Sequence, residues 1–240
     1  MSAASTPLLT TQSEPWFQKG RSYIYLSAGG EEFSEKWFNI RKGLRTLFRS
    51  TVEDAAFMPQ YALIAYPTDS CYALGFRLDN TSGGQRIRRI RSLDDAHHFT
   101  LVCADFAQLG QLVHLDNAAF RAIKSATPGP YTFILPATKE VPRRLAHPRK
   151  RTVGVRIPDH PVVQALLRAL DEPLVSSTLL LPDAEDPMTD GWSIKEALDP
   201  VIDAVVDGGD CGTLPTTVVD WSQGYPEVVR AGAGDPARFR

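Results

Sequence analysis

The sequence predicts a single mixed α/β domain. Its 240 residues suit one large α/β domain or two small ones, with a substantial buried core. Short apolar runs typical of strands mix with amphipathic runs typical of helices, without the regular strand–helix–strand rhythm of a purely parallel sheet. No repeat, long linker or change in charge divides the chain, so we expect one folded unit.

The composition narrows the class of protein. An apolar fraction of 43% and a charged fraction of 22% are ordinary for a globular protein. The formal net charge is −2, so affinity for nucleic acid would require a local basic patch. The cysteines Cys71, Cys103 and Cys211 are far apart and odd in number, which indicates free thiols rather than a disulfide scaffold or a zinc site.

The N-terminal segment and the hydropathy of the chain predict the cellular compartment of the protein. Residues 1–20 are expected to form a disordered leader ahead of a domain over residues 21–240. This leader lacks the charged start and apolar stretch of a secretory signal, and no apolar run reaches transmembrane length. With the free thiols, these features predict a cytoplasmic protein without a membrane partner.

The first half of the chain predicts four strands and two helices. The run at 31–48 has apolar residues at helical spacing. Thr81 or Ser82 can cap a helix from about Gly83 to Ile90. The strands are short apolar runs bounded by turn residues, at 21–26, 61–66, 71–76 and 99–103.

The second half predicts two helices, at 117–126 and 161–170, and a series of strands. The first helix ends in the breaker TPGP. In TVGVRIP the valines and the isoleucine take one face, while Thr152, Gly154 and Arg156 take the other. Further strands are predicted at 131–135, 174–181, 201–207, 216–221 and 227–232.

The stretch YPTDSCYALGF places polar residues between two apolar runs. Pro67, Asp69 and Ser70 are common turn formers, and the local chemistry by itself favours a plain turn. The alternative is a group of small polar side chains at a strand end that holds a polar ligand, with Thr68 and Tyr72 among them.

The stretch RIRRIR, residues 86–91, concentrates positive charge on a helix. Ile87 and Ile90 can pack inward, which leaves the arginines as exposed pairs. A solvated helix end, where cations favour the negative pole of the dipole, is one interpretation. A phosphate clamp is the other, because the planar guanidinium presents a fork of donors. Asp94 and Asp95 could supply carboxylates.

Two further strands carry unexpected polar groups. Arg156 lies on a core-like strand and needs a partner or a ligand; a salt bridge to Asp159 or another acid is the simpler interpretation. Ser176, Ser177 and Thr178 interrupt an apolar strand. Their hydroxyls can bond to neighbouring backbone or, at a cleft, donate to phosphate or carboxylate oxygens.

Other familiar motifs are missing from the sequence. There is no P-loop, no GxGxxG after a strand and no GxSxG. The pair His97-His98 has no further ligand at metal spacing, so we expect a surface or turn pair.

Taken together, these stretches resemble the YrdC/YciO family of threonylcarbamoyl-AMP synthase-like proteins, over residues 59–236. YPTDSCYALG is similar to the family's PT(D/E)xxYGLG, RIR at 89–91 to K-x-R, PGPYTFIL to PGPxT, and VGVRIPDHP to V(A/G)VRxPxHP. LVSST falls on S-T-S-A-N, and TLPTTVVD with VVRAG resembles the closing STVVD and RxG. YPTDSCYAL, the Arg-rich helix, HFTL, TKEVPRRL and SSTLLLP look closer to the YciO branch than to the synthases.

The resemblance implies a YrdC-like domain, with a twisted mixed sheet and helices around a concave, electropositive cavity. It implies a reaction in which ATP, L-threonine and bicarbonate give threonylcarbamoyl-AMP and diphosphate, a step toward tRNA modification. ATP or AMP, L-threonine and bicarbonate are the implied partners, and Mg²⁺ arrives with ATP. The residues that the resemblance assigns to the cavity are Thr68, Tyr72, Arg89, Arg91, Thr132, Arg156, Ser176, Thr178, Thr217 and Arg230.

This chemistry needs positioning and charge more than a reactive side chain. Carboxylated threonine attacks the α-phosphate, so the protein must hold two anions in line and neutralise the departing diphosphate. We therefore assign no catalytic residue and no protein-derived metal ligand. Two departures bear on the rate: Arg89 stands where the synthases have Lys, and Leu180 where they have Asn. Loss of one such donor costs about 100-fold.

Two other functions remain open from the sequence. The basic stretches 86–91 and 143–151 suit an RNA-binding protein without catalysis, acting on tRNA or double-stranded RNA. A nucleotide or small-molecule hydrolase on the same fold would use Asp69 or Asp220 as a base.

Overall fold

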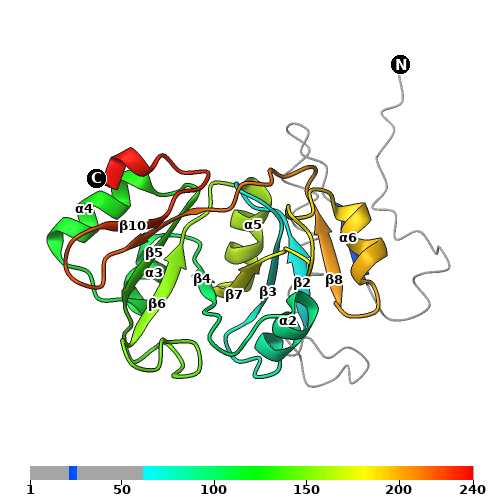
Figure 1. Cartoon of the computed structure of the whole chain (residues 1–240), viewed down its shortest axis with the longest axis horizontal. Helices are drawn as coiled ribbons and strands as arrows, with labels where there is room; N and C mark the ends of the chain where they lie inside the picture. Colours follow the sequence, from blue (N-terminus) through cyan, green and yellow to red (C-terminus); the bar gives the residue numbers. More distant parts are fainter. Residues whose placement is uncertain (1–21, 26–61, 240) are drawn as a thin grey trace, which may run out of the picture.

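A ten-stranded mixed sheet runs through the part of the chain that the computed structural model describes, residues 22–25 and 62–239 (Figure 1). The predicted leader and the predicted helix at 31–48 lie outside the described residues. No helix in the described ranges is long and apolar enough to span a bilayer. The mixed α/β class predicted from the sequence is confirmed.

Each strand predicted from the sequence is present, some with shorter bounds. The predicted strand at 174–181 ends at Thr178, because the chain leaves the sheet there. The strands are β1 Ser22–Tyr25, β2 Leu63–Tyr66, β3 Ala73–Arg77, β4 Thr100–Val102, β5 Tyr131–Pro136, β6 Thr152–Arg156, β7 Leu174–Thr178, β8 Ala204–Asp207, β9 Thr217–Asp220 and β10 Glu227–Arg230. Their order in the sheet is β1-β8-β2-β3-β7-β4-β6-β5-β9-β10.

Helices include two that the sequence interpretation missed, α3 and α6. Both are short, but each has a recognisable N-cap, because Asp105 accepts from the backbone N–H of Gln108 and Asp190 from that of Ser193. The helices are α2 Gly83–Arg91, α3 Phe106–Leu112, α4 Asn117–Ala126, α5 Pro161–Leu170 and α6 Gly191–Leu198, followed by the 3₁₀ helix η3 Pro236–Phe239.

Helix α2 begins where predicted, but its capping bonds come from a different residue. Ser82 occupies the N-cap position without a side-chain capping bond. Instead, Oδ1 of Asn80 accepts from the backbone N–H groups of Ser82 (3.0 Å) and Gly83 (2.9 Å). This satisfies donors that would otherwise be left free at the helix start. The side-chain amide of the buried Asn80 also donates to the Ala62 carbonyl, which ties the helix start to the start of β2.

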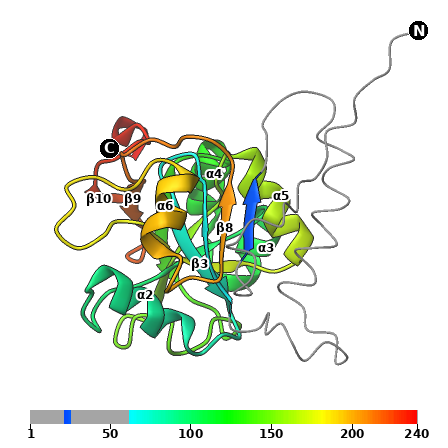
Figure 2. The ribbon, with the colours of Figure 1, turned by 90° about the vertical axis from the view of Figure 1, so that its right-hand side faces the viewer.

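The two faces of the sheet have different partners. On one face, core residues such as Leu74, Leu101 and Phe133 belong to a cluster that includes Ile87 of α2 and Ile123 of α4. On the other, α5 packs against β2 and its neighbours in a second cluster. Figure 2 shows α5 and α2 on opposite sides of the sheet. Past the area that α5 covers, this second face carries small polar residues.

The strand register brings residues distant in sequence onto this polar area. Thr100 of β4 lies opposite Ser176 of β7 and Gly154 of β6. Ile134 of β5 lies opposite Gly154 and Asp220 of β9. Because paired residues share a face of a sheet, these five positions form one continuous surface.

Candidate functional site

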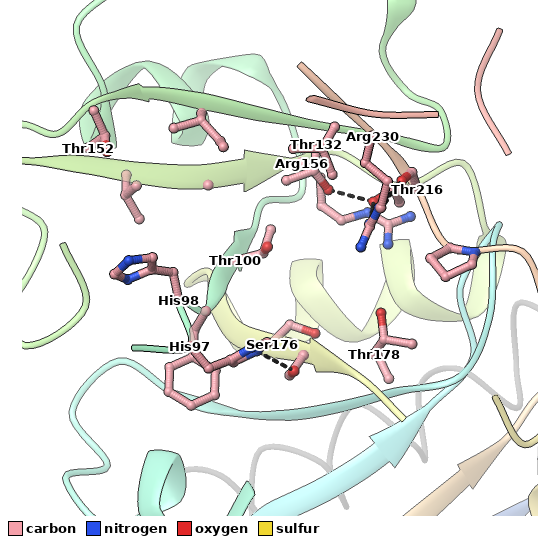
Figure 3. Close-up of a pocket in the computed structure, with 18 of the residues that line it drawn as sticks. His97, His98, Thr100, Thr132, Thr152, Arg156, Ser176, Thr178, Thr216 and Arg230 are labelled. Carbon is pink, nitrogen blue, oxygen red and sulfur yellow. Dashed lines mark hydrogen bonds between the residues drawn. The ribbon is translucent and has the colours of Figure 1, made fainter. Parts of the chain in front are cut away.

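A cavity of about 470 Å³ lies over this polar area of the sheet (Figure 3). Figure 3 shows Arg156, Thr216 and Arg230 together on one side of it and His98 on the other. The hydroxyl-bearing lining residues are Thr100, Thr132, Thr152, Ser176, Ser177, Thr178 and Thr216. The lining residues with ionisable nitrogen are Arg91, Lys150, Arg156, Arg230, His97, His98 and His147. Asp220 is the one carboxylate in the lining formed by the described residues.

Strand alternation decides which residues of β6 face the cavity, whereas at the end of β7 the consecutive residues Ser176, Ser177 and Thr178 all line it. In β6, Thr152, Gly154 and Arg156 line it, while Val153 and Val155 belong to the core cluster, although Val153 also borders the cavity. The predicted division of TVGVRIP into two faces is therefore confirmed. A Cβ built on Gly154 would lie 3.3 Å from Oγ1 of Thr100, so a glycine keeps this part of the cavity floor open.

Arg156 forms its salt bridge with Asp69, whereas Asp159 was the acid named in the sequence prediction. Its Nη2 donates to Oδ1 of Asp69, and the two side chains are 9% and 8% exposed. The other oxygen of Asp69 accepts from the backbone N–H of Asp159 (2.9 Å), so Asp159 contributes its backbone rather than its carboxylate. Nε of Arg156 is buried and has no hydrogen-bond partner among the described residues. The ion pair thus leaves one buried donor of Arg156 unsatisfied.

Two further arginines point into the cavity without a carboxylate partner among the described residues. Nε of Arg91 donates to the Leu180 carbonyl (3.1 Å) and Nη1 to Oγ of Ser177 (2.5 Å). Nε and Nη2 of Arg230 donate to the Thr216 carbonyl at 3.2 and 2.9 Å. Burial lowers the pKa of both guanidinium groups from its usual range. Burying a charged guanidinium without a counter-ion costs free energy. An anion in the cavity would offset that cost for Arg91 and Arg230.

Six of the ten residues predicted from the sequence line the cavity: Arg91, Thr132, Arg156, Ser176, Thr178 and Arg230. They come from α2 and from the four strands β5, β6, β7 and β10. The hydroxyls of Thr132 and Thr216 lie 2.8 Å apart and are hydrogen-bonded to each other. The hydroxyl of Ser176 donates to the Leu74 carbonyl (3.2 Å). The same oxygen accepts from Tyr66 (2.7 Å), whose pKa burial raises to about 12.

The other four predicted residues lie outside the lining, and local geometry explains each. Arg89 is exposed on α2, because it is about 200° around the helix from Arg91. Thr216 and Val218 line the cavity. Thr217 lies between them, so its side chain points to the opposite face of the strand. Its hydroxyl instead donates to the Gly234 carbonyl and accepts from the N–H of Gly232.

Thr68 and Tyr72 serve the turn between β2 and β3. Oγ1 of Thr68 donates to the Cys71 carbonyl (2.7 Å) and accepts from the N–H of Ser70 (3.2 Å). These local bonds agree with the interpretation of the stretch as a turn. The hydroxyl of Tyr72 lies 3.0 Å from the Gly209 carbonyl. Cys71 does line the cavity. The stretch YPTDSCYALGF therefore forms a turn whose Asp69 holds Arg156, although its Thr and Tyr do not reach the cavity.

The histidines are the part of the site that the sequence interpretation missed. His98 is exposed, and the backbone N–H of His97 closes a turn to the Asp94 carbonyl, as expected of a surface or turn pair. Both also line the cavity, together with His147, which was not predicted. The rings of His98 and His147 lie 4.7 Å apart. Nδ1 of His147 accepts from the N–H groups of Arg149 and Lys150, which leaves Nε2 to carry the proton of the neutral ring. The basic segment 143–151, which contributes His147 and Lys150 to the lining, was the available sequence signal for this side of the cavity.

The arginines of α2 do not act together as one clamp. Arg86 pairs with Asp203 at 2.6 Å. Nε of Arg88 lies 3.8 Å from a carboxylate oxygen of Asp95, and its guanidinium lies over the Phe99 ring, 4.8 Å from the centroid. Within RIRRIR, only Arg91 lines the cavity.

Comparison with known proteins gives consistent matches. The Sua5/YciO/YrdC family model, described as "Telomere recombination", matches residues 57–232. "Uncharacterized protein YciO" of Escherichia coli (strain K12) is 48% identical over 177 residues, which cover 74% of this chain and 86% of that protein. A Haemophilus influenzae protein is 44% identical over 178 residues, with the same two shares, 74% and 86%.

Solved structures agree with this match. The E. coli YciO crystal structure has a TM-score of 0.80 and 40% identity, and the match covers 92% of this chain and 100% of that chain. The structure of P. abyssi Sua5 complexed with L-threonine has a TM-score of 0.73 and 24% identity, covering 88% of this chain and 57% of that one. At 24% identity the second likeness shows the fold alone.

Proposed function

The chain belongs to the Sua5/YciO/YrdC family, and on that basis we propose that it is an L-threonylcarbamoyladenylate synthase-like enzyme. In this proposal ATP, L-threonine and bicarbonate give threonylcarbamoyl-AMP and diphosphate, in support of tRNA modification in the cytoplasm. The P. abyssi Sua5 structure, complexed with L-threonine, supports threonine as the amino acid. The free thiols of the three cysteines suit a reducing compartment.

One observation carries the proposal: three arginines from separate elements converge on a single cavity lined by hydroxyls. Arg91 and Arg230 have no carboxylate partner among the described residues, and Arg156 adds a third guanidinium, which is paired with Asp69. Arginine forks and hydroxyls suit phosphate and carboxylate oxygens. A volume of about 470 Å³ lies within the range of small-ligand sites.

The proposed chemistry rests on positioning. A carboxylated threonine and the α-phosphate of ATP are both anionic, so they approach in line only where fixed cations offset their repulsion. Mg²⁺ would enter with the phosphates of ATP and stabilise the departing diphosphate. The hydroxyls of Thr132, Ser176 and Thr178 can orient the substrate oxygens, with AMP as the nucleotide part of the product.

The test is a product assay by mass spectrometry with ATP, Mg²⁺, L-threonine and bicarbonate. Leu180 offers a side chain without donors at the cavity, so a Leu180→Asn variant is run beside the wild type. Threonylcarbamoyl-AMP from wild type supports a synthase that tolerates Leu180. Product from the variant alone indicates a cavity diverged from synthesis. Absence of threonylcarbamoyl-AMP from both proteins, together with no threonine-dependent release of AMP from ATP, refutes the proposal.

A second candidate, binding of tRNA or double-stranded RNA without synthesis, is favoured by one surface. Five exposed cations lie within the nine residues 143–151: Arg143, Arg144, Arg149, Lys150 and Arg151. Lys150 also lines the cavity. Phosphate contacts release counterions, so binding to RNA should weaken steeply as salt rises. A binding constant that does not change between about 50 and 200 mM salt rejects this candidate.

A further inference from the structure

Three side chains at the edge of the cavity form a compact polar group. Ser177 of β7 places its Oγ 3.1 Å from Nε2 of His97 and 2.5 Å from Nη1 of Arg91. All three residues line the cavity, and Figure 3 marks the bond of His97 with a dashed line. Thr100, the first residue of β4, pairs with Ser176. Ser177 therefore lies one residue beyond the paired part of the two strands, where its hydroxyl reaches the segment before β4.

The possible donors determine where the proton of Ser177 lies. A guanidinium only donates, so Oγ accepts from Arg91. Burial and the neighbouring cations Arg91 and Arg88 lower the pKa of His97 to about 4, which keeps its ring neutral at pH 7. In the Nδ1–H tautomer of the neutral ring, the Ser177 O–H donates to Nε2 of His97. The hydroxyl thus lies between a base at 3.1 Å and a fixed cation on the same oxygen. Its low pKa makes His97 a weaker base than an ordinary imidazole, so the cation supplies much of the activation by stabilising the developing alkoxide.

Neighbouring hydroxyls do not share this arrangement. Ser176 lines the same cavity, but its oxygen is bonded to Tyr66 and to the Leu74 carbonyl. Arg91 is also fixed independently of Ser177, because its Nε donates to the Leu180 carbonyl. The cation therefore stays beside the oxygen when the serine proton moves, as stabilisation of developing negative charge requires.

We propose that Ser177 is a nucleophile, with His97 as its base and Arg91 as the stabilising cation, and that it hydrolyses acyl-adenylates. The choice of an acyl-adenylate rests on the proposed function, because Arg156 and Arg230 in the same cavity suit the phosphate of the leaving nucleotide. The assignment of the nucleophile rests on the Ser177 geometry alone.

The reaction takes two steps. Oγ of Ser177 attacks the acyl carbonyl carbon, its proton passes to Nε2 of His97, and the bond between that carbon and the phosphate oxygen breaks, leaving its electron pair on AMP. His97 then releases this proton to solvent. A water molecule attacks the acyl-serine ester and gives its proton to His97, which returns a proton to Oγ as the ester bond breaks. The net change is acyl-adenylate plus water to acid plus AMP.

The nucleophile is tested with a small fluorophosphonate, which reacts with activated serines as the P–F bond breaks and fluoride leaves. The wild type is expected to gain one adduct, which peptide fragmentation assigns to Ser177 and not to Ser176. Ser177→Ala should lose the adduct, and His97→Asn should slow labelling about 100-fold or more, as for loss of a general base. Ser125→Ala, on the exposed side of α4, should label at the wild-type rate.

Two results overturn the nucleophile, and neither depends on a variant that folds poorly. One is a wild type without adduct at a large excess of reagent. The other is an adduct mapped to a residue other than Ser177. If the His97→Asn variant keeps its native circular dichroism spectrum and labels at the wild-type rate, the role of His97 as base is wrong.

The substrate is tested with acetyl-adenylate in ¹⁸O-water. Hydrolysis through an acyl-serine places ¹⁸O in the acetate and leaves AMP unlabelled. AMP release lost in Ser177→Ala supports the proposal, whereas a labelled Ser177 without AMP release overturns the acyl-adenylate activity. Calorimetric binding of AMP to the same samples reports separately on the proposed nucleotide site, so failure of hydrolysis and failure of the proposed function are distinguished.

Discussion

Helix α2 offers a sharp comparison between two arginines two residues apart. Arg91 lines the cavity, whereas Arg89 is exposed and lies outside the lining. Arg91→Ala removes the guanidinium from the cavity, and Arg89→Ala removes the same group from the opposite side of the helix. Both variants lose one positive charge, so the change in net charge cancels between them. Any difference in nucleotide affinity then reports on position.

The expected magnitude follows from the contacts. Leu180 and Ser177 hold Arg91 through Nε and Nη1, so the remaining N–H groups of its guanidinium are available to a phosphate. A hydrogen bond to a charged group contributes about 1.5–3 kcal/mol, so loss of one should raise the Kd for Mg²⁺·ATP roughly 10- to 150-fold. Arg89→Ala should change the Kd by less than about 2-fold, because an exposed charge is screened by solvent and salt.

Isothermal titration calorimetry with Mg²⁺·ATP, at two salt concentrations, measures both variants. Urea unfolding of each variant separates a loss of binding from a loss of stability. The reasoning is refuted if Arg89→Ala weakens binding as much as Arg91→Ala does. That result would mean that the net charge of α2, and not the position of Arg91 in the cavity, attracts the nucleotide.

Three further outcomes are expected. Asp69→Ala should lower the free energy of unfolding by about 3–5 kcal/mol, because it leaves the buried Arg156 unpaired; Asp159→Ala, which keeps the backbone donor, should change it by less than about 0.5 kcal/mol in the same urea titrations. The pKa of His97 is lowered to about 4, so the unfolded chain takes up a proton between about pH 6.5 and 4 that the folded chain does not. Stability should fall as pH falls through that window, and His97→Asn should flatten this part of the profile. Thr217→Val should lower the free energy of unfolding by about 1–3 kcal/mol, because it leaves the Gly232 N–H without its acceptor; an unchanged urea midpoint would contradict this.

Much of the fold was predictable because it depends on local patterns. Alternation in TVGVRIP fixed which residues of β6 face the cavity, since the side-chain period of a strand is two. Helices α4 and α5 begin and end as predicted, because breakers and apolar spacing bound them. Helices α3 and α6 were missed because each has only two turns and little periodicity to detect. Their Asp caps were the available signal.

The site was predicted only in part. Motif positions identified Arg91, Arg156 and Arg230, but a motif spacing does not tell whether Arg89 or Arg91 points inward. The helix phase decides this, and it depends on where Ile87 packs. The partner of Arg156 was also open: Asp69 is 87 residues away in sequence, and only the turn after β2 brings it close.

The sequence by itself determined the mixed α/β class, the strand faces and the family, because each rests on short patterns set by backbone geometry and residue type. The tertiary structure alone decided which polar residues meet. His97, Ser177 and His147 come from three segments, and only the order β7-β4-β6-β5 in the sheet places those segments around one cavity. Local periodicity carries no information on that order, since it arises from how the whole chain buries its apolar faces.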